Sequence, residues 1–232
     1  MMTGSSKPIV IFGTGDIGEL AHFYFTHDSS RQIAGFCADG AFIESPEHLG
    51  APLVAFEEVE QTFPPDRYDM FVALSYRKVN QVRAQKYDEA KQRGYALASY
   101  VCSRSVIWPN LQIGDNCFIL ENQTIQPFVK IGNNVTMWSG NHLGHHSVIG
   151  DHCFITSEVV ISGHVTVESH CFLGVNATIR DGITIGREGV IGAGAVILKN
   201  TEPKAVHMAR PTGRFLSDSS RSPYFVNTRY GR

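Results

Sequence analysis

The chain has 232 residues, a formal net charge of −2 and 18% charged residues. This balance excludes the strongly basic surface of most nucleic-acid-binding proteins and the polybasic patch of a membrane-surface protein. No apolar run approaches the roughly 18 residues that a spanning helix needs, and the opening MMTGSSKP lacks a signal-peptide core. Five cysteines without a CxxC pair predict free thiols. We therefore expect a cytoplasmic protein with one large or two small domains.

The first hundred residues predict strands that alternate with helices. The run PIVIF at 8–12 is typical of a buried strand, and GTGDIG at 13–18 joins it to an apolar helical stretch that ends near Phe25. Such alternation implies a small parallel sheet. Further strands are predicted at 32–38, 69–74 and 95–100, and a helix at 78–93.

The glycine turn at 13–18 indicates a nucleotide site. A GxGxxG motif carries that meaning when a strand precedes it and a helix follows, although the same motif also serves as a purely structural turn. Asp39 ends the second strand, where a carboxylate can reach a ribose or a base. A full dinucleotide-binding domain needs roughly 150 residues. Only about 95 are available, which corresponds to half of such a domain, so the expected ligand is a mononucleotide.

The strongest signal in the sequence is a repeat of six residues. Sixteen consecutive positions at this spacing, from Ile107 to Ile197, carry Ile, Leu, Val or Met. A period of six fits neither an amphipathic helix nor a heptad, but it is typical of the hexapeptide β-helix, in which three short strands complete one coil. The position two residues earlier is mostly small or apolar. It includes Cys117, Cys153 and Cys171, which we therefore expect to be core residues rather than nucleophiles.

A small Rossmann-like domain followed by hexapeptide coils resembles the sugar acyltransferases of the NeuD or PglD-like family. The likeness spans residues 7 to about 214. It is carried by IVIFGTGDIGE, VALSYRKVNQVRAQKYDEAKQRGY, SGNHLGHHSVIGDHCFI and FLGVNATIRDGITIGREGVIGAGAVILKN. The fold class that it implies is α/β plus all-β, with a small parallel sheet domain and then a left-handed parallel β-helix. The predicted domains are a nucleotide-sugar-binding domain at 1–102, an acyltransferase β-helix at 103–202 and a C-terminal extension at 203–232.

The resemblance also implies an activity. It is the transfer of an acetyl group from acetyl-CoA to a nucleotide-linked amino deoxysugar, in the synthesis of a surface glycan such as lipopolysaccharide or O-antigen. The family acts as a homotrimer, with active sites between neighbouring prisms and no metal cofactor. By the family pattern His145 is the general base, a role that suits histidine because its unperturbed pKa is near 6.5. Gly163 offers a backbone N–H to the thioester carbonyl, and transfer to the amine is direct, without an acyl-enzyme.

The remaining family positions concern binding. The turn Pro211-Thr212-Gly213-Arg214 resembles the family's closing turn. The residues expected to bind CoA are Gly163, Val175, Gly192, Ala193, Gly194 and Lys199. Those expected to bind the nucleotide sugar are Gly13, Thr14, Gly15, Asp16, Asp39, Tyr76 and Asn80.

The sequence departs from the family around the predicted base. His146 stands where a carboxylate often follows the catalytic histidine, and a second family histidine falls on Phe154. The group that orients His145 therefore stays open, with His146 and His164 as orienting or accessory candidates. On a coil of 18 residues His146 lies next to His164. By the same spacing His152 lies next to His170.

The dense histidines raise the possibility of a zinc enzyme. The β-helical carbonic anhydrases hold zinc with two histidines five residues apart and a third further back. No pair in the repeat has that spacing, and His22 with His27 lies in the front domain. We therefore expect no metal.

The same sequence is compatible with three more functions: a sugar O-acyltransferase, transfer of a longer acyl chain and a non-catalytic binding trimer. A hydroxyl needs a stronger base than an amine does, so the absence of a carboxylate after His145 favours the amine. The helix at 78–93 presents either a solvated face or, through Asn80 and Arg83, a phosphate contact.

Overall fold

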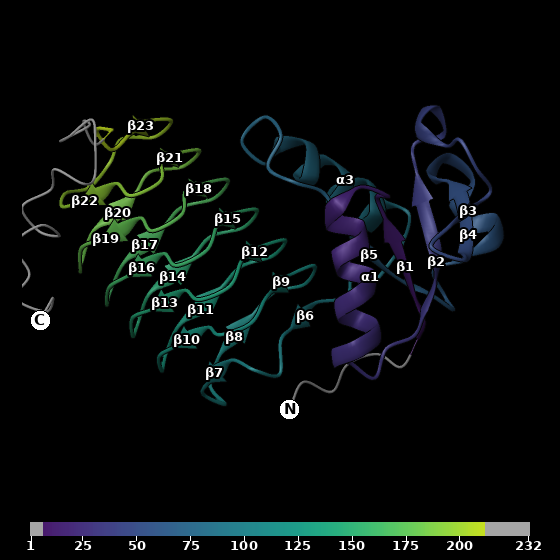
Figure 1. Ribbon diagram of the computed structural model, residues 1–232, viewed down its shortest axis with the longest axis horizontal. Coiled ribbons are helices and arrows are strands. Elements are labelled where there is room, and N and C mark those ends of the chain that lie inside the picture. Colours follow the sequence, from purple (N-terminus) through teal and green to yellow (C-terminus); the bar gives the residue numbers. More distant parts are fainter. Residues whose placement is uncertain (1–6, 212–232) are drawn as a thin grey trace, which may run out of the picture.

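The computed structural model describes residues 7–211 and consists of an α/β domain followed by a left-handed parallel β-helix. Figure 1 shows the coils of the β-helix stacked in a row, with the first coil nearest the α/β domain and the last at the far end. This architecture confirms the predicted fold class. No helix within the described residues has the length and apolar character to cross a membrane.

The front domain contains a five-stranded sheet in the order β3-β4-β2-β1-β5. All neighbouring strands are parallel except β3 and β4, which form an antiparallel edge. The edge pair escaped the sequence analysis because Pro52 interrupts its short apolar run, and proline weakens any strand prediction. The strands are β1 (Ile9–Phe12), β2 (Ile33–Ala38), β3 (Glu47–His48), β4 (Ala51–Ala55) and β5 (Asp69–Val72).

The helices of this domain pack beside the sheet. The helix predicted at 78–93 begins only at residue 81, because Lys78, Val79 and Asn80 all have positive φ. The strand predicted at 95–100 is reduced to a bridge between Met70 and Leu97 and to the first β-helix strand. The helices are α1 (Asp16–Asp28), η1 (Gly40–Phe42), η2 (Phe56–Glu58), α2 (Val59–Thr62) and α3 (Gln81–Gln92).

Three parallel sheets form the faces of the triangular β-helix, and we name each by its first strand. The β7 sheet contains β7 (Val106–Ile107), β10 (Thr124–Ile125), β13 (His142–Leu143), β16 (Val160–Ile161), β19 (Thr178–Ile179) and β22 (Val196–Ile197). The β8 sheet contains β8 (Gln112–Ile113), β11 (Lys130–Ile131), β14 (Val148–Ile149), β17 (Thr166–Val167) and β20 (Thr184–Ile185). The β6 sheet contains β6 (Tyr100–Val101), β9 (Phe118–Ile119), β12 (Thr136–Met137), β15 (Phe154–Ile155), β18 (Phe172–Leu173), β21 (Val190–Ile191) and β23 (Val206–His207).

The second residue of each strand from β7 to β22 belongs to the six-residue repeat and faces the interior. Neighbouring coils pair residues 18 apart, as Leu143 pairs with Ile125 and Ile161. Nearly all of these aliphatic side chains are buried in one continuous core, as the repeat predicted. Cys117, Cys153 and Cys171 lie in the same core, and burial raises the pKa of Cys117 to about 12. All three side chains are fully buried, so no substrate can reach these thiols as nucleophiles.

The three edges of the prism are rows of left-handed residues, most of them 18 positions apart. Such a conformation favours Gly and Asn, and other residues adopt it at a cost. We call the edge between the β7 and β8 sheets the histidine edge, the edge between the β8 and β6 sheets the docking edge, and the edge between the β6 and β7 sheets the third edge. Left-handed residues include Phe128, His146, His164 and Gly182 on the histidine edge, Asn116, Asn134, His152 and His170 on the docking edge, and Asn122, Gly140, Glu158, Asn176 and Gly194 on the third edge.

Buried polar groups fasten the front domain to the docking edge. The guanidinium of Arg83, on α3, is 1% exposed and donates to the backbone carbonyls of Asn134, His152 and Cys153. Asn116 bonds both the N–H and the C=O of Val72 in β5. These contacts occupy edge groups that would otherwise lack partners, so they fix α3 and the sheet relative to the prism.

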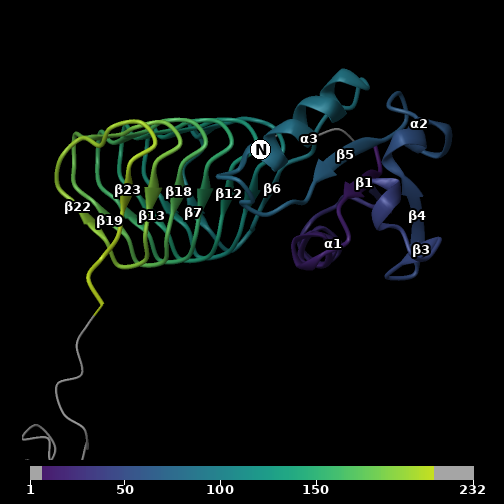
Figure 2. The ribbon, with the colours of Figure 1, turned by 90° about the horizontal axis from the view of Figure 1, so that it is seen from above.

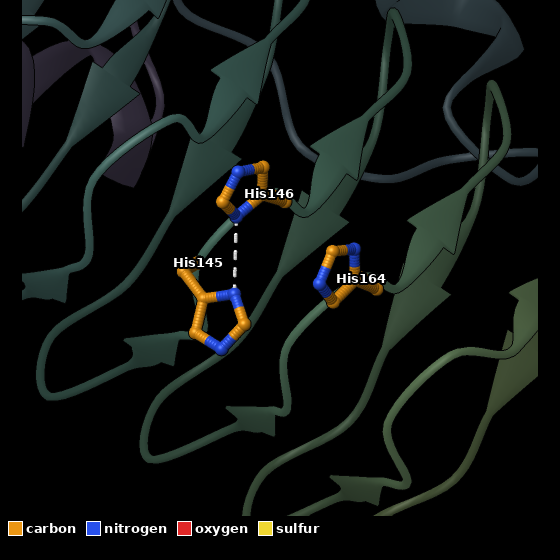
Figure 3. A group of neighbouring side chains, drawn as sticks. All are labelled: His145, His146 and His164. Atoms are coloured by element: carbon orange, nitrogen blue, oxygen red, sulfur yellow. Dashed lines mark hydrogen bonds between the residues drawn. The ribbon is translucent and has the colours of Figure 1, made fainter.

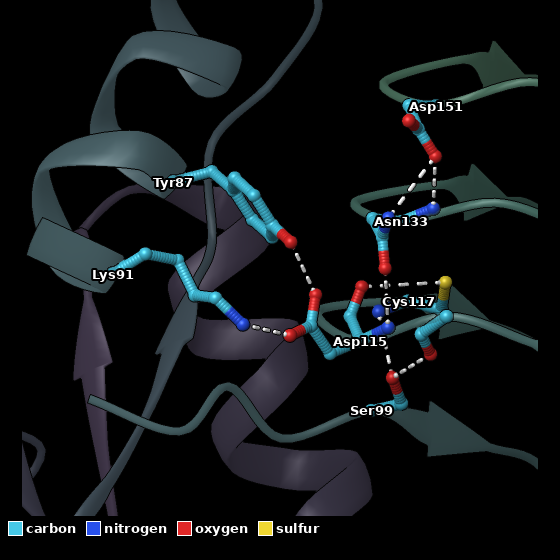
Figure 4. Close-up of polar contacts among 8 residues, drawn as sticks. Tyr87, Lys91, Ser99, Asp115, Cys117, Asn133 and Asp151 are labelled. Carbon is cyan, nitrogen blue, oxygen red and sulfur yellow. Dashed lines mark hydrogen bonds and ion pairs between the residues drawn. The ribbon is translucent and has the colours of Figure 1, made fainter. Parts of the chain in front are cut away.

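A second group of contacts lies nearer the end of α3. Tyr87 donates to one oxygen of Asp115 at 2.5 Å, and Lys91 contacts the other oxygen at 2.5 Å (Figure 4). The amide oxygen of Asn133, one coil further, accepts from the backbone N–H of Asp115.

At the other end of the prism, β23 pairs with β21, so regular coiling continues beyond residue 202, the end proposed for the β-helix domain.

Candidate active site

His145 lies on the histidine edge, between β13 and β14. Its backbone N–H donates to Oε1 of Gln126 at 2.8 Å, and its ring Nδ1 lies 3.1 Å from Nδ1 of His146 (Figure 3). The ring of His146 stacks on that of His164, with centroids 4.9 Å apart and planes 12° apart. The predicted stacking of these two residues is confirmed, and His152 and His170 form the other expected pair at 4.7 Å.

Gly163 lies beneath the imidazole of His145. A Cβ at this position would lie 2.9 Å from Cε1 and 3.0 Å from Nε2 of the ring. The N–H of Gly163 has no acceptor among the described residues, whereas its C=O accepts from the N–H of Gly182. The site therefore combines a proton acceptor with a nearby unpaired backbone donor, which is the pair of groups that acyl transfer requires.

A cleft of about 920 Å³ lies between the front domain and the prism. Gly13 has φ +113°, and a Cβ there would come within 2.7 Å of the carbonyl oxygen of Ala73, so the turn requires glycine. Six of the seven residues predicted to bind the nucleotide sugar line the cleft, namely Gly13, Thr14, Gly15, Asp16, Asp39 and Tyr76. Residues of the prism that complete the wall are Trp138, Phe154, Thr156, Ser157 and Val175.

Two basic side chains of the cleft were not predicted. Lys86 contacts Asp39 at 2.6 Å and Glu89 at 2.8 Å. Burial lowers the pKa of Lys86, but the bonds to these carboxylates outweigh burial and raise the pKa above its ordinary value. Arg77 is exposed at the rim and follows Tyr76, whose ring packs on Phe154 and Phe172. Their place in the sequence, on and just before a polar helix, carries no signal for a cleft.

The chain resembles solved structures over most of its length. PerB from Caulobacter crescentus, solved with CoA and GDP-perosamine, matches with a TM-score of 0.78 and 21% identity over 88% of this chain and 95% of that one. The acetyltransferase domain of PglB from Neisseria gonorrhoeae matches with a TM-score of 0.77 and 18% identity over 88% and 98%. WeeI from Acinetobacter baumannii matches with a TM-score of 0.59 and 19% identity over 86% and 95%. No curated protein sequence matches the chain.

A family model described as the hexapeptide repeat of succinyl-transferase matches residues 164–199. The chain carries this hexapeptide repeat and has the same overall fold as the solved structures. The comparisons thus confirm the predicted resemblance, and at these identities the likeness to the solved structures establishes the fold.

In this hexapeptide-repeat protein His145 and the cleft lie on different sides of the prism. The prism residues of the cleft belong to the β6 sheet or follow its strands, on the third edge. His145 lies on the edge between the other two sheets, which is the edge opposite the β6 sheet in a triangular section. In Figure 2 the front domain lies at one end of the prism. One chain therefore does not bring its own cleft to its own His145.

The residues predicted to bind CoA occupy two edges. Val175 and Gly194 lie on the third edge in neighbouring coils, joined by a bond from the N–H of Gly194 to the carbonyl of Val175, and Ala193 is beside them. Lys199 follows β22 as His145 follows β13, and it is exposed on the histidine edge. A Cβ at Gly192 would meet Sδ of Met208 at 2.5 Å, so packing within the chain accounts for this glycine.

The prediction that Asn80 binds the nucleotide sugar is wrong. Asn80 is fully buried and donates to the carbonyls of His170 and Cys171. The phosphate contact considered for Arg83 is wrong for the same reason, because the docking edge encloses its guanidinium. Neither residue lines the cleft. Of the closing turn predicted at 211–214, residues 212–214 lie outside the described residues.

The histidine edge also brings three metal-ligating side chains together. One ring nitrogen from each of His145, His146 and His164 lies within 4.8 Å of the others. The coil length of 18 residues predicted that His146 lies next to His164, and the structure adds His145 to this pair. The expectation of no metal rested on the five-residue spacing of the carbonic anhydrases, which this cluster does not have.

Proposed function

We propose that this protein is an acetyl-CoA-dependent N-acetyltransferase that acts on a nucleotide-linked amino deoxysugar. The observation that carries the proposal is the position of His145 over Gly163, with a ring nitrogen and an unpaired N–H side by side. Two solved structures of the same fold support the choice of substrates, since PerB is described with CoA and GDP-perosamine and the PglB domain with acetyl coenzyme A.

The chemistry requires one proton acceptor and one oxyanion donor. The amine attacks the thioester carbonyl, a C–N bond forms, the C–S bond breaks, and His145 takes the proton of the amine and returns it to the CoA thiolate. When Nδ1 of His145 donates to Nδ1 of His146, Nε2 is left free to accept that proton. His146 then orients the base in place of a carboxylate. The N–H of Gly163 stabilises the tetrahedral oxyanion, and one such donor is typically worth about 3 kcal/mol.

The complete site forms between two chains. The amino sugar binds in the cleft, with the turn at 13–16 and Asp39 near the nucleotide and Arg77 near its phosphates. The base comes from another copy, because His145 and the cleft of one chain face different ways. A homotrimer with three equivalent interfaces supplies this arrangement. CoA then extends along the coils past Val175, Ala193, Gly194 and Lys199.

We place the reaction in the cytoplasm, as one step in the synthesis of a surface glycan. All five cysteines are free thiols buried within the chain, which fits a reducing compartment.

The test is release of free CoA thiol from acetyl-CoA with amino sugars linked to GDP, UDP or dTDP. His145→Ala should lower kcat by about two orders of magnitude or more, because it removes the general base. His170→Ala, in the other pair of neighbouring histidines, is the matched control and should turn over normally. Turnover of the His145→Ala variant at the wild-type rate refutes the assigned base. A hydroxy sugar accepted in preference to the amine refutes N-acetylation in favour of O-acylation.

A further inference from the structure

The three imidazoles of the histidine edge have a geometry that the proposed transfer does not require. Transfer to an amine uses one base and one orienting group, yet His164 adds a third ring at 5.0 Å from that of His145. The rings of His145 and His164 are nearly perpendicular, at 87°. All three side chains are exposed, and none of them forms an ion pair with a carboxylate in the described part of the chain.

Their backbone positions are fixed although their side chains are exposed. His164 donates its N–H to the carbonyl of His145 at 2.9 Å, so consecutive coils hold these residues together. His146 and His164 share the left-handed conformation of the edge, with φ of 62° and 57°, and their rings lie parallel. Gly163 leaves the space in which the ring of His145 lies beside these two rings. The edge thus presents three nitrogen ligands from a rigid frame.

The spacing suits a transition-metal ion. Zinc bound to imidazole nitrogens at about 2.0–2.1 Å in a tetrahedron separates those nitrogens by about 3.3 Å. Nδ1 of His145 and Nδ1 of His146 are already 3.1 Å apart, and the remaining separations of up to 4.8 Å close by small rotations of exposed rings. Three neutral imidazoles with an open fourth position are a typical ligand set for Zn²⁺, and Cu²⁺ or Ni²⁺ prefer the same donors.

We propose that His145, His146 and His164 form a site for a zinc-class divalent ion, and that the bound ion blocks acetyl transfer. The block rests on the proposed function. A metal bound to Nδ1 of His145 requires the neutral tautomer with its proton on Nε2, so Nε2 has no lone pair left to accept the proton of the amine. The site itself rests on the geometry alone. The bound ion is therefore an inhibitor, because it competes with the proton of the amine for His145.

Binding is tested without any turnover, on the untagged full chain titrated with Co²⁺ and then Zn²⁺. We expect one Co²⁺ per chain with the visible bands of tetrahedral coordination, and displacement of those bands by Zn²⁺. His146→Ala and His164→Ala should each weaken binding by about tenfold or more, whereas His170→Ala should leave it unchanged. Absence of a stoichiometric tetrahedral spectrum overturns the site. Equal weakening by His170→Ala also overturns it, because the ion would then bind elsewhere.

Inhibition is tested separately on the wild type and on His170→Ala. Zn²⁺ at the concentration that fills the site should abolish release of CoA thiol in both, and a chelator should restore it. If Zn²⁺ fills the three-histidine site and turnover continues, the inhibition is refuted, and so is the role of His145 as the base. If Co²⁺ and Zn²⁺ fail to bind while His145→Ala is inactive, the metal site fails and the proposed function stands.

Discussion

The imidazole of His145 lies against the α-carbon of Gly163, one coil further along the prism. The ring and a Cβ at position 163 would be 2.9 Å apart, closer than real Cβ contacts permit. Gly163 is not among the residues with positive φ, so the position needs glycine for space and not for its backbone conformation. A substitution at Gly163 therefore tests whether catalysis requires the imidazole in this position.

Gly163→Ala should lower kcat by about tenfold or more while the thermal midpoint of unfolding changes little. The added methyl group displaces the ring of His145 from its place beside the N–H of residue 163, and general-base catalysis depends on that geometry. Steady-state kinetics and a thermal melt measure the two effects. In a His145→Ala background the same substitution should cost nothing further. An additive loss would mean that Gly163 acts independently of the imidazole.

Two inactive variants should restore activity when they are mixed. Gly15→Leu fills the cleft without a clash, since no atom lies within 4 Å of a Cβ at this position, and His145→Ala removes the base. In a randomly mixed trimer about a quarter of the shared sites pair an intact cleft with an intact His145. The two variants are unfolded and refolded together, and CoA release is compared with that of each variant alone. No recovery would show that the cleft and the base act within one chain.

Arg83→Met should destabilise the protein by about 3 kcal/mol, because it leaves buried carbonyls without donors. Burial lowers the pKa of Arg83 only to about 10, so the guanidinium stays charged at neutral pH. Urea denaturation at matched protein concentration measures the change. Arg67→Met, at an exposed arginine of the front domain, should change stability by less than about 0.5 kcal/mol. Similar losses in the two variants would contradict the role of the buried contacts.

His152 should make the fold less stable as the pH falls from about 6.5 to about 4. Burial, and then the neighbouring charge of His170, lower the pKa of His152 to about 4. The unfolded chain therefore takes up a proton in this window that the native chain does not, which favours unfolding; above the window the residue has no effect. The amide oxygen of Asn134 accepts from Arg83 and Asn116, so its amide nitrogen faces Nδ1 of His152 and needs that atom unprotonated.

The variant His152→Asn isolates this effect. Asparagine supplies an acceptor for Asn134, tolerates the φ of 61° at this position and does not titrate. Its thermal midpoint should fall less than that of the wild type between pH 7 and pH 5. The difference at pH 8 measures packing alone. Identical pH dependence of the thermal midpoint in the two proteins would show that His152 does not cause the loss of stability at low pH.

The β-helix could be predicted in detail because its information is local and repeated. Each strand needs one inward aliphatic residue at a fixed phase, and sixteen such positions from Ile107 to Ile197 leave little freedom of register. The glycine turn was recognisable because its requirement for glycine is also local. A Cβ at Gly18 would lie 2.1 Å from the carbonyl oxygen of Gly13, only five residues earlier. The two pairs of neighbouring histidines followed from the coil length of 18.

The front domain was less predictable where its side chains contact residues that are distant in the sequence. Asn80 and Arg83 stand on or just before a helix whose sequence is polar on most sides, and polarity usually indicates solvent. Their burial depends on the unpaired carbonyls of a docking edge that begins more than 30 residues later. No period or motif in 78–93 carries that information.

The sequence by itself determined the prism, its register, its buried cysteines and the glycine turn at 13–18, because each depends on residues a fixed short distance apart. Only the tertiary structure decided that His145, His146 and His164 meet, that Asn80 and Arg83 are internal, and that His145 lies away from the cleft of its own chain. The physical reason is that these relationships are set by how the coils stack and how the front domain docks on one edge. Such contacts join residues whose separation along the chain does not reveal their distance in space.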